Sequence, residues 1–158
     1  EFAPGHVTVV VESCDLDSSR ATDDLCQGIR EELSSRCDCV MAAENRLHVV
    51  GSTVITVSCT VKVEMEDLDK SAAAQQELMQ RLEELINVRW RERNIGSQIR
   101  VGQVWQTVRS VPNVRRIQSI LLEGRYDQAG IERLAALEED DAFPYATVRS
   151  GTHFIQII

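Results

Sequence analysis

Residues 100–123 read RVGQVWQTVRSVPNVRRIQSILLE, and the fold that the sequence predicts depends on this stretch. Its first half repeats apolar residues at the spacing of one helix face: Val101, Val104, Trp105, Val108 and Val111. Pro112 ends that helix, because its ring disfavours the α region for the residue before it. Asn113 suits a tight, left-handed turn, and the β-branched and aliphatic residues of 114–122 then predict a strand. The rest of the chain must supply the sheet that this strand joins.

Upstream of this stretch, the hydrophobic period switches between strand and helix. Valine-rich residues 6–13 predict a first strand, and residues 46–50 predict a second. A helix is expected between them, from a cap at Thr22 to about residue 36, with one apolar stripe: Leu25, Ile29 and Leu33. Strict alternation over residues 55–63 predicts a strand with one buried side. A long helix follows to about residue 94, with an apolar face: Leu78, Leu82, Leu85 and Ile86.

This order of segments predicts an α+β fold. Strand, helix, strand, strand, helix, short helix and strand is the order of a ferredoxin-like split βαβ sandwich, with two long helices on one face of an antiparallel sheet. We expect this sandwich to form one domain over residues 1–124. Residues 125–158 are expected to form a C-terminal extension with a short helix or loop, marked by Ile131, Leu134 and Leu137, and a final strand.

The composition limits the partners that such a domain can have. The formal net charge of −8 argues against nucleic acid and anionic membranes, because both select basic surfaces. No apolar run reaches the roughly 20 residues that a membrane-spanning helix needs. Because the sequence starts at Glu1 and not at a methionine, we expect it to be a segment of a longer chain.

The sequence lacks the residue patterns of known catalytic, cofactor and metal sites. It has no glycine-rich phosphate loop, no nucleophile elbow and no zinc-protease helix motif. Its five cysteines do not suit the disulfide framework of a small secreted domain. The close pair Cys37 and Cys39 lacks the second ligand pair that zinc requires, whereas Cys26 and Cys59 fall on apolar faces and are expected to be buried. The residues alone predict a soluble α+β binding or structural module, not an enzyme, with no bound cofactor or metal.

Four segments resemble the C-terminal part of the baseplate protein J family, in particular its baseplate assembly proteins. Residues 4–11, PGHVTVVV, resemble the family's Pro-Gly-x-Val-x-Val strand, and residues 47–63 are similar to its Val-Val-Gly turn and long alternating strand. Residues 101–114 match its Gly-x-x-Val helix and Val-Pro-Gly-Val turn, and residues 151–157 resemble its closing Gly-x-His-x-Ile segment. The chain departs from this pattern in three places: Asn113 where Gly is usual, Ser52 where Pro is usual, and no Pro-containing loop after the long helix.

The resemblance implies a non-catalytic wedge component of a contractile phage tail or a phage-tail-like injection system. Such subunits link the central hub to the sheath and fibres within a multi-subunit assembly. The resemblance also implies a cytoplasmic location during assembly, and then residence in a tail or an extracellular injection particle. For contacts with other wedge, hub, sheath or fibre proteins we expect exposed apolar surface at Trp90, Phe154, Ile155, Ile157 and Ile158. The competing interpretation is that these five residues belong to the core.

Two other functions stay open on the sequence. Ferredoxin-like sandwiches also serve as small-molecule-sensing regulatory domains, which requires a pocket with converging polar groups between strand and helix ends. An enzyme that uses Cys37 or Cys39 requires an activated thiol beside a cation, and Arg36 precedes Cys37 in the sequence.

Overall fold

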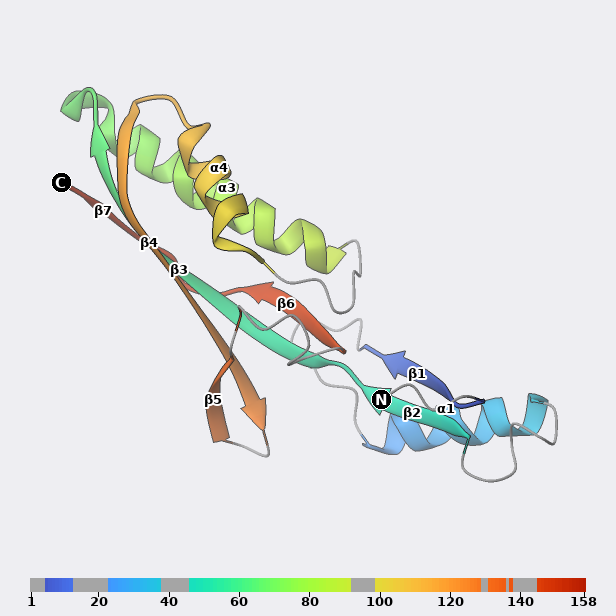
Figure 1. The fold of residues 1–158 in the computed structure, drawn as a ribbon. Coiled ribbons are helices and arrows are strands. Elements are labelled where there is room, and N and C mark those ends of the chain that lie inside the picture. Colours follow the sequence, from blue (N-terminus) through green and yellow to red (C-terminus); the bar gives the residue numbers. More distant parts are fainter. Residues whose placement is uncertain are drawn as a thin grey trace. The chain divides into compact units, whose positions relative to one another are not determined.

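The computed structural model describes residues 5–12, 23–37, 46–91, 99–128, 131–135, 137 and 145–158. Its elements follow one another (Figure 1) in the order β1 (Val7–Val11), α1 (Asp23–Arg36), β2 (Leu47–Gly51), β3 (Thr53–Met65), the 3-10 turn η2 (Leu68–Lys70), α3 (Ser71–Arg91), α4 (Val101–Arg109), β4 (Val114–Gln128), β5 (Ile131–Ala135), β6 (Ala146–Ser150) and β7 (Phe154–Ile157). The predicted mixture of helices and strands is confirmed, with three α-helices in the described residues. Contacts within the chain define two compact units, Glu1–Thr53 and Val54–Ile158. The predicted domain boundary at residue 124 falls inside β4.

The first unit is a strand–helix–strand module. β1 and β2 pair in parallel, with Val7 opposite Leu47, and parallel neighbours need a crossover such as α1 to join them. α1 contacts β2, but its predicted stripe is only partly buried, because Leu25 is 44% exposed and Ile29 and Leu33 are intermediate. Cys26, expected to be buried, is also intermediate.

The larger sheet is built around β3 and is mostly antiparallel. Its strand order is β5-β4-β3-β6, and β7 also pairs with β3. β4 runs antiparallel to β3, and β5 runs antiparallel to β4. β7 runs parallel to β3, with Phe154 opposite Thr60. β6 and β7 therefore share the edge of β3 that β4 does not occupy.

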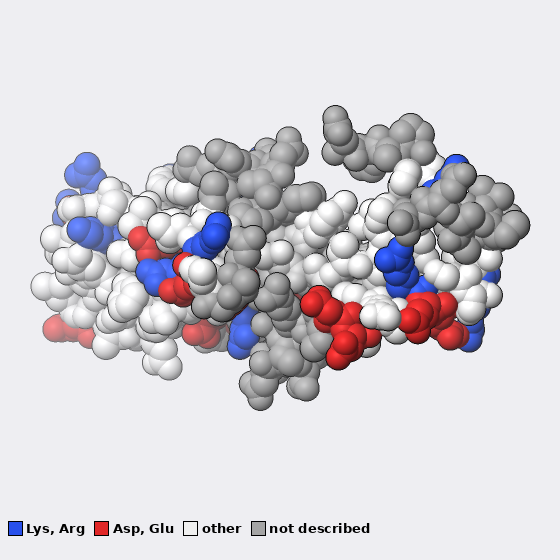
Figure 2. All heavy atoms as spheres, turned by 90° about the horizontal axis from the view of Figure 1, so that it is seen from below, with Lys and Arg blue, Asp and Glu red and all other residues white. Residues whose placement is uncertain are grey.

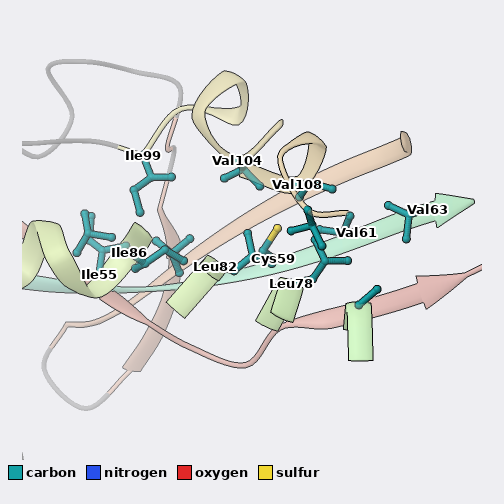
Figure 3. Packing of buried hydrophobic residues seen from close by; sticks show 14 of the residues in the cluster. Ile55, Cys59, Val61, Val63, Leu78, Leu82, Ile86, Ile99, Val104 and Val108 are labelled. Atoms are coloured by element: carbon teal, nitrogen blue, oxygen red, sulfur yellow. The ribbon is translucent and has the colours of Figure 1, made fainter. Parts of the chain in front are cut away.

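The core lies between one face of β3 and the helices α3 and α4 (Figure 3). The predicted alternation of β3 is confirmed, because its odd-numbered residues are buried: Ile55, Val57, Cys59, Val61 and Val63. They pack against an apolar stripe of α3 and two valines of α4: Leu78, Leu82, Ile86, Val104 and Val108. The described helices of this unit thus cover one face of the sheet, and its other face carries the alternate, mostly polar residues of β3.

The apolar face of α4 is narrower than predicted. Val104, Val108 and Val111 are buried, but Val101 is 39% exposed and Trp105 41% exposed. A helix turns by about 100° per residue, so Trp105 points well away from the direction of Val104. The Arg109 guanidinium lies 5.0 Å from the centre of the Trp105 ring instead. Of the five apolar residues predicted to share one face, only Val104, Val108 and Val111 are therefore in the core.

Asn113 takes the predicted left-handed turn between α4 and β4. Its φ is 74°, and it is the one non-glycine residue with positive φ in the described part of the chain. Its carbonyl oxygen accepts from the Glu66 amide at 3.0 Å. Its side-chain Oδ1 accepts from the Asp67 amide, and its Nδ2 donates to the Asp67 carbonyl, both at 2.8 Å. The side chain thus extends the ladder of β3 and β4 by one more pair of hydrogen bonds, which a glycine cannot supply.

We expect Asn113→Ala to lower the free energy of unfolding by about 2 kcal/mol, because alanine loses both bonds to Asp67 and is poorly suited to positive φ. Asn113→Gly tolerates this φ and should lose only about 1 kcal/mol. Urea unfolding followed by tryptophan fluorescence measures both losses. Equal losses in the two variants would show that the positive φ of residue 113 does not penalise alanine relative to glycine.

The short helix expected around residues 131–137 is a strand over its first five residues. β5 pairs with residues 124–128 of β4, along the edge of that strand that β3 does not occupy. Ile131 is 60% exposed and Leu134 72% exposed, so their helical spacing meets no core surface that would stabilise a helix. Strand pairing decides the structure here, and the prediction of a short helix or loop is wrong over residues 131–135.

Candidate partner-binding edge of the sheet

Four of the five predicted contact residues lie together at the end of the chain, on β7 and directly after it. Phe154 is 61% exposed and Ile158 is 54% exposed, whereas Ile155 and Ile157 are half-buried and pack against the core. Alternation along a strand explains the division, because successive side chains point to opposite faces. The fifth residue, Trp90, belongs to α3, but its side chain lies outside the described part of the structure.

The outer edge of β7 presents backbone groups that β3 does not use. The Ile158 amide donates to the Val63 carbonyl at 3.0 Å. Because residues of a strand direct their N–H and C=O groups alternately to one edge and the other, Phe154 and Gln156 also face β3. The N–H and C=O groups of Ile155 and Ile157 face away from it. Within the described residues β7 pairs with β3 alone, so these groups form an open strand edge.

Apolar side chains continue from β7 onto the sheet face that the helices leave uncovered. Phe154 and Leu121 lie on either side of Thr60 in one row across β7, β3 and β4. Leu121 is 56% exposed. Further along the sheet, Leu134 lies opposite Arg125. This face therefore combines polar strand residues with a small number of large exposed apolar groups.

Gly151 brings the chain close to β3 just before β7. Its amide donates to the Val57 carbonyl at 2.8 Å. A Cβ at this position would lie 2.7 Å from the Ser58 Oγ and 2.8 Å from the Thr56 Cγ2. Only glycine fits without displacing these neighbours, so the Gly of the Gly-x-His segment serves a close approach of the backbone.

His153 fills the gap between β6 and β7 along the edge of β3. Its side chain is buried, and its Nδ1 accepts from the Cys59 amide at 3.2 Å. Its Nε2 lies 2.8 Å from the Ser150 Oγ. The imidazole thus supplies the acceptor that a continuous neighbouring strand would have supplied, and it positions β7.

The Ser150–His153 contact has the distance of a nucleophile and its base, but its proton arrangement differs. A backbone amide can only donate, so the Nδ1 lone pair is used by Cys59 and a neutral imidazole carries its proton on Nε2. Nε2 therefore donates to Ser150 and has no lone pair to accept the hydroxyl proton, as nucleophile activation requires. Burial lowers the pKa of His153 below its ordinary value of 6.5, against a weaker opposite effect of Glu83, and favours this neutral form.

The described cysteines differ in exposure. Cys59 is buried in the core as predicted, and burial raises the pKa of its thiol to about 11, so it stays protonated and unreactive. Cys37 is exposed at the end of α1. Cys39, the alternative candidate for an activated thiol, lies outside the described residues.

The β1–β2 register brings together two histidines that are 42 residues apart. The rings of His6 and His48 stack at 5.3 Å, and Nδ1 of His6 lies 3.1 Å from Nε2 of His48. Sequence reasoning missed this pair, because their proximity depends on parallel pairing of Thr8 with His48. Among the residues that the structure describes, no group of three or more His, Cys, Asp or Glu residues is arranged to hold a metal ion.

A hollow of about 660 Å³ runs along one flank of α1 within the first unit. Six side chains of α1 and one of β2 line it: Asp23, Cys26, Gln27, Arg30, Glu31, Ser34 and Val49. Acidic, basic and neutral polar groups converge here, which is the kind of lining that the sensor hypothesis requires.

On the face shown in Figure 2, the charged side chains of the described residues lie in several small groups, and in some of these groups basic and acidic side chains adjoin. Among the described helices, none combines the length and the apolar character that crossing a bilayer demands.

Comparisons with known proteins add no assignment. No protein-family model matches the chain. No curated protein matches it either. The interpretation of this edge therefore depends on its geometry and on the motifs in the sequence.

Proposed function

We propose that the chain is a structural baseplate wedge component of a contractile phage tail or a phage-tail-like injection system, and that it acts by protein–protein assembly. The observation that carries the proposal is the exposed apolar edge strand β7, with Phe154 61% exposed and Ile158 54% exposed. Proteins commonly protect edge strands with charged residues or proline, and residues 154–158 contain neither. An open edge of this composition suits a subunit whose partners supply the next strand.

The motifs behind the resemblance support a structural role by what they do in the fold. Gly151 and His153 hold β7 on β3, and Asn113 joins the α4–β4 turn to the end of β3. Each is explained by backbone geometry or by hydrogen bonding within the fold. The proposal therefore assigns them no catalytic role and places the partners at β7 and the adjoining uncovered sheet face.

Both the detailed fold of the chain and its location in the cell and the particle are part of the proposal. The ferredoxin-like split βαβ arrangement stays our proposal for the whole chain. A structure of the assembled particle tests this point directly. The proposed partners are wedge, hub, sheath or fibre subunits, met first in the cytoplasm and then in the tail or extracellular particle.

Purification of the full-length parent protein from its native lysate tests the function. We expect sheath, tube and spike-hub proteins, identified by mass spectrometry, to copurify and tail-like particles to appear by electron microscopy. Phe154→Asp should reduce this copurification at least about tenfold, because it places a charge in an apolar contact. Leu68→Asp is the control, since Leu68 is 70% exposed on η2 and is not part of β7. A parent protein that elutes without tail proteins would overturn the proposal.

The hollow along α1 favours a second candidate function, a small-molecule-sensing regulatory domain. A polar metabolite bound there should raise the melting temperature of the chain, because it binds only the folded state. Ser34→Phe should remove this stabilisation by filling the hollow, whereas Ser35→Phe, at an exposed neighbouring position outside its lining, should keep it. If no metabolite in a panel raises the melting temperature of the unaltered chain or of Ser35→Phe, this candidate function is ruled out.

A further inference from the structure

We propose that the outer edge of β7 pairs antiparallel with β7 of a second copy of this chain, around a two-fold axis at Gln156. The inference deepens the assembly proposal, on which it rests for the role of the edge, by naming a partner for it. Two further observations carry it: the symmetric placement of the free backbone groups, and the match of the side chains on both faces of the strand.

The free backbone groups are arranged symmetrically about Gln156. Ile155 and Ile157 direct their N–H and C=O groups away from β3, as the bond from Ile158 to Val63 requires. In an antiparallel pair centred on Gln156, Ile155 lies opposite Ile157 of the second copy, and the two exchange both hydrogen bonds. By symmetry, Ile157 of the first copy and Ile155 of the second copy also exchange two hydrogen bonds. Four hydrogen bonds then use every outward-facing group of these two residues.

The side chains match on both faces in this register. On the uncovered sheet face, exposed Phe154 lies opposite exposed Ile158 of the second copy. On the helix face, half-buried Ile155 lies opposite Ile157 of the second copy. Residues directly opposite each other in antiparallel strands have Cβ atoms about 5 Å apart, so these apolar pairs are in contact. A two-fold axis requires such self-complementarity.

Other centres for the axis fit less well. An axis at Ile155 would place exposed Phe154 opposite Gln156, and it would need outward-facing groups from His153, which belongs to the buried junction with β6. An axis at Ile157 would pair Gln156 with Ile158. Only the axis at Gln156 pairs apolar residues with apolar residues on both faces of the strand. It also places the two Gln156 side-chain amides side by side, where they can hydrogen-bond to each other.

The self-pairing is tested by exchanging charges at the axis. Analytical ultracentrifugation of the 158-residue chain should show a concentration-dependent dimer. Gln156→Lys and Gln156→Glu should each weaken self-association at least about tenfold, because like charges then lie directly opposite each other. An equimolar mixture of the two variants should dimerise again as a heterodimer. Gln106→Lys adds the same charge at an exposed position on α4 and should dimerise like the unaltered chain.

A second variant tests the backbone bonds. Ile157→Pro removes an N–H that faces outward and leaves the amides that face β3, so it should weaken the dimer while circular dichroism stays unchanged. A monomer at all concentrations up to about 100 µM would overturn the self-pairing, as would a dimer that Gln156→Lys leaves intact or a mixture that stays monomeric. In the last two cases, either the chain associates through another surface, or its β7 edge pairs with a strand of a different protein. A monomer that still copurifies with tail proteins overturns only the self-pairing, and a dimer without them overturns only the baseplate proposal.

Discussion

Replacing His153 with alanine is expected to lower the free energy of unfolding of the second unit by about 3 kcal/mol. The substitution leaves the Cys59 amide, whose residue is fully buried, without its acceptor, and it opens a cavity where the imidazole lay. His153→Gln should recover about half of the loss, because its side-chain oxygen can accept the same bond. Both tryptophans, Trp90 and Trp105, belong to this unit, so tryptophan fluorescence during urea unfolding reports on it.

The stabilising role of His153 should also depend on pH. Burial lowers its pKa below 6.5, so below that pH the unfolded chain binds a proton more readily than the folded chain. Stability is therefore fully present above about pH 6.5 and is lost as the pH falls through the lowered pKa of the folded state. Between about pH 7.5 and pH 5.5, we expect the advantage of the unaltered chain over His153→Gln to shrink by up to about 1 kcal/mol.

His48→Ala is the matched control, because it removes an exposed histidine from the first unit. The fluorescence-detected stability of the second unit should change by less than about 0.5 kcal/mol in this variant. A similarly small change in His153→Ala would contradict the bridging role of the imidazole between β6 and β7. A constant difference from His153→Gln across the pH range would contradict the neutral, buried state.

Elements with a strong local period could be predicted from the sequence. The alternation of residues 55–63 predicted which side of β3 is buried, because β3 is covered by helices on one face only. The stripe of Leu78, Leu82 and Ile86 did the same for α3. The turn at Asn113 followed from local chemistry, since Pro112 ends the helix and asparagine tolerates positive φ.

Features that depend on distant pairing could not be predicted in the same way. Strand β5 forms on the edge of β4 that β3 leaves unpaired, and the spacing of Ile131 and Leu134 carries no information about that edge. β6 was missed for a similar reason, since it uses an edge of β3 from far along the chain. The width of the buried face of α4 also depends on what packs against it, which is why the spacing alone could not separate exposed Trp105 from buried Val104.

The candidate site was predictable in part. Sequence reasoning selected the apolar end of the chain but could not separate exposed Phe154 from half-buried Ile155. Alternate residues of a strand face opposite sides of the sheet, but this alternation separates exposed from buried residues only when one of them is known to face the core. The bond from Ile158 to Val63, which determines the direction of the free backbone groups, requires the pairing itself.

Leu82→Ala is expected to lower the free energy of unfolding of the second unit by about 3 kcal/mol, the usual loss for a leucine truncated in a packed core. Leu82 is fully buried and meets the apolar face of β3 from the middle of α3. Its neighbours belong to a strand and two helices that fix one another, so they have little freedom to close the cavity, and much of the cavity penalty should remain. Urea unfolding with tryptophan fluorescence measures the loss.

Leu134→Ala makes the same chemical change on the surface and is expected to alter the stability by less than about 0.5 kcal/mol, because Leu134 is 72% exposed on β5. The two leucines look alike in sequence, since each belongs to an apolar series with helical spacing. Their difference arises from strand pairing, which gives β5 no helix to pack against. A loss near that of Leu82→Ala would mean that β5 is covered in solution, and that the apolar face proposed for partners is already occupied by the chain itself.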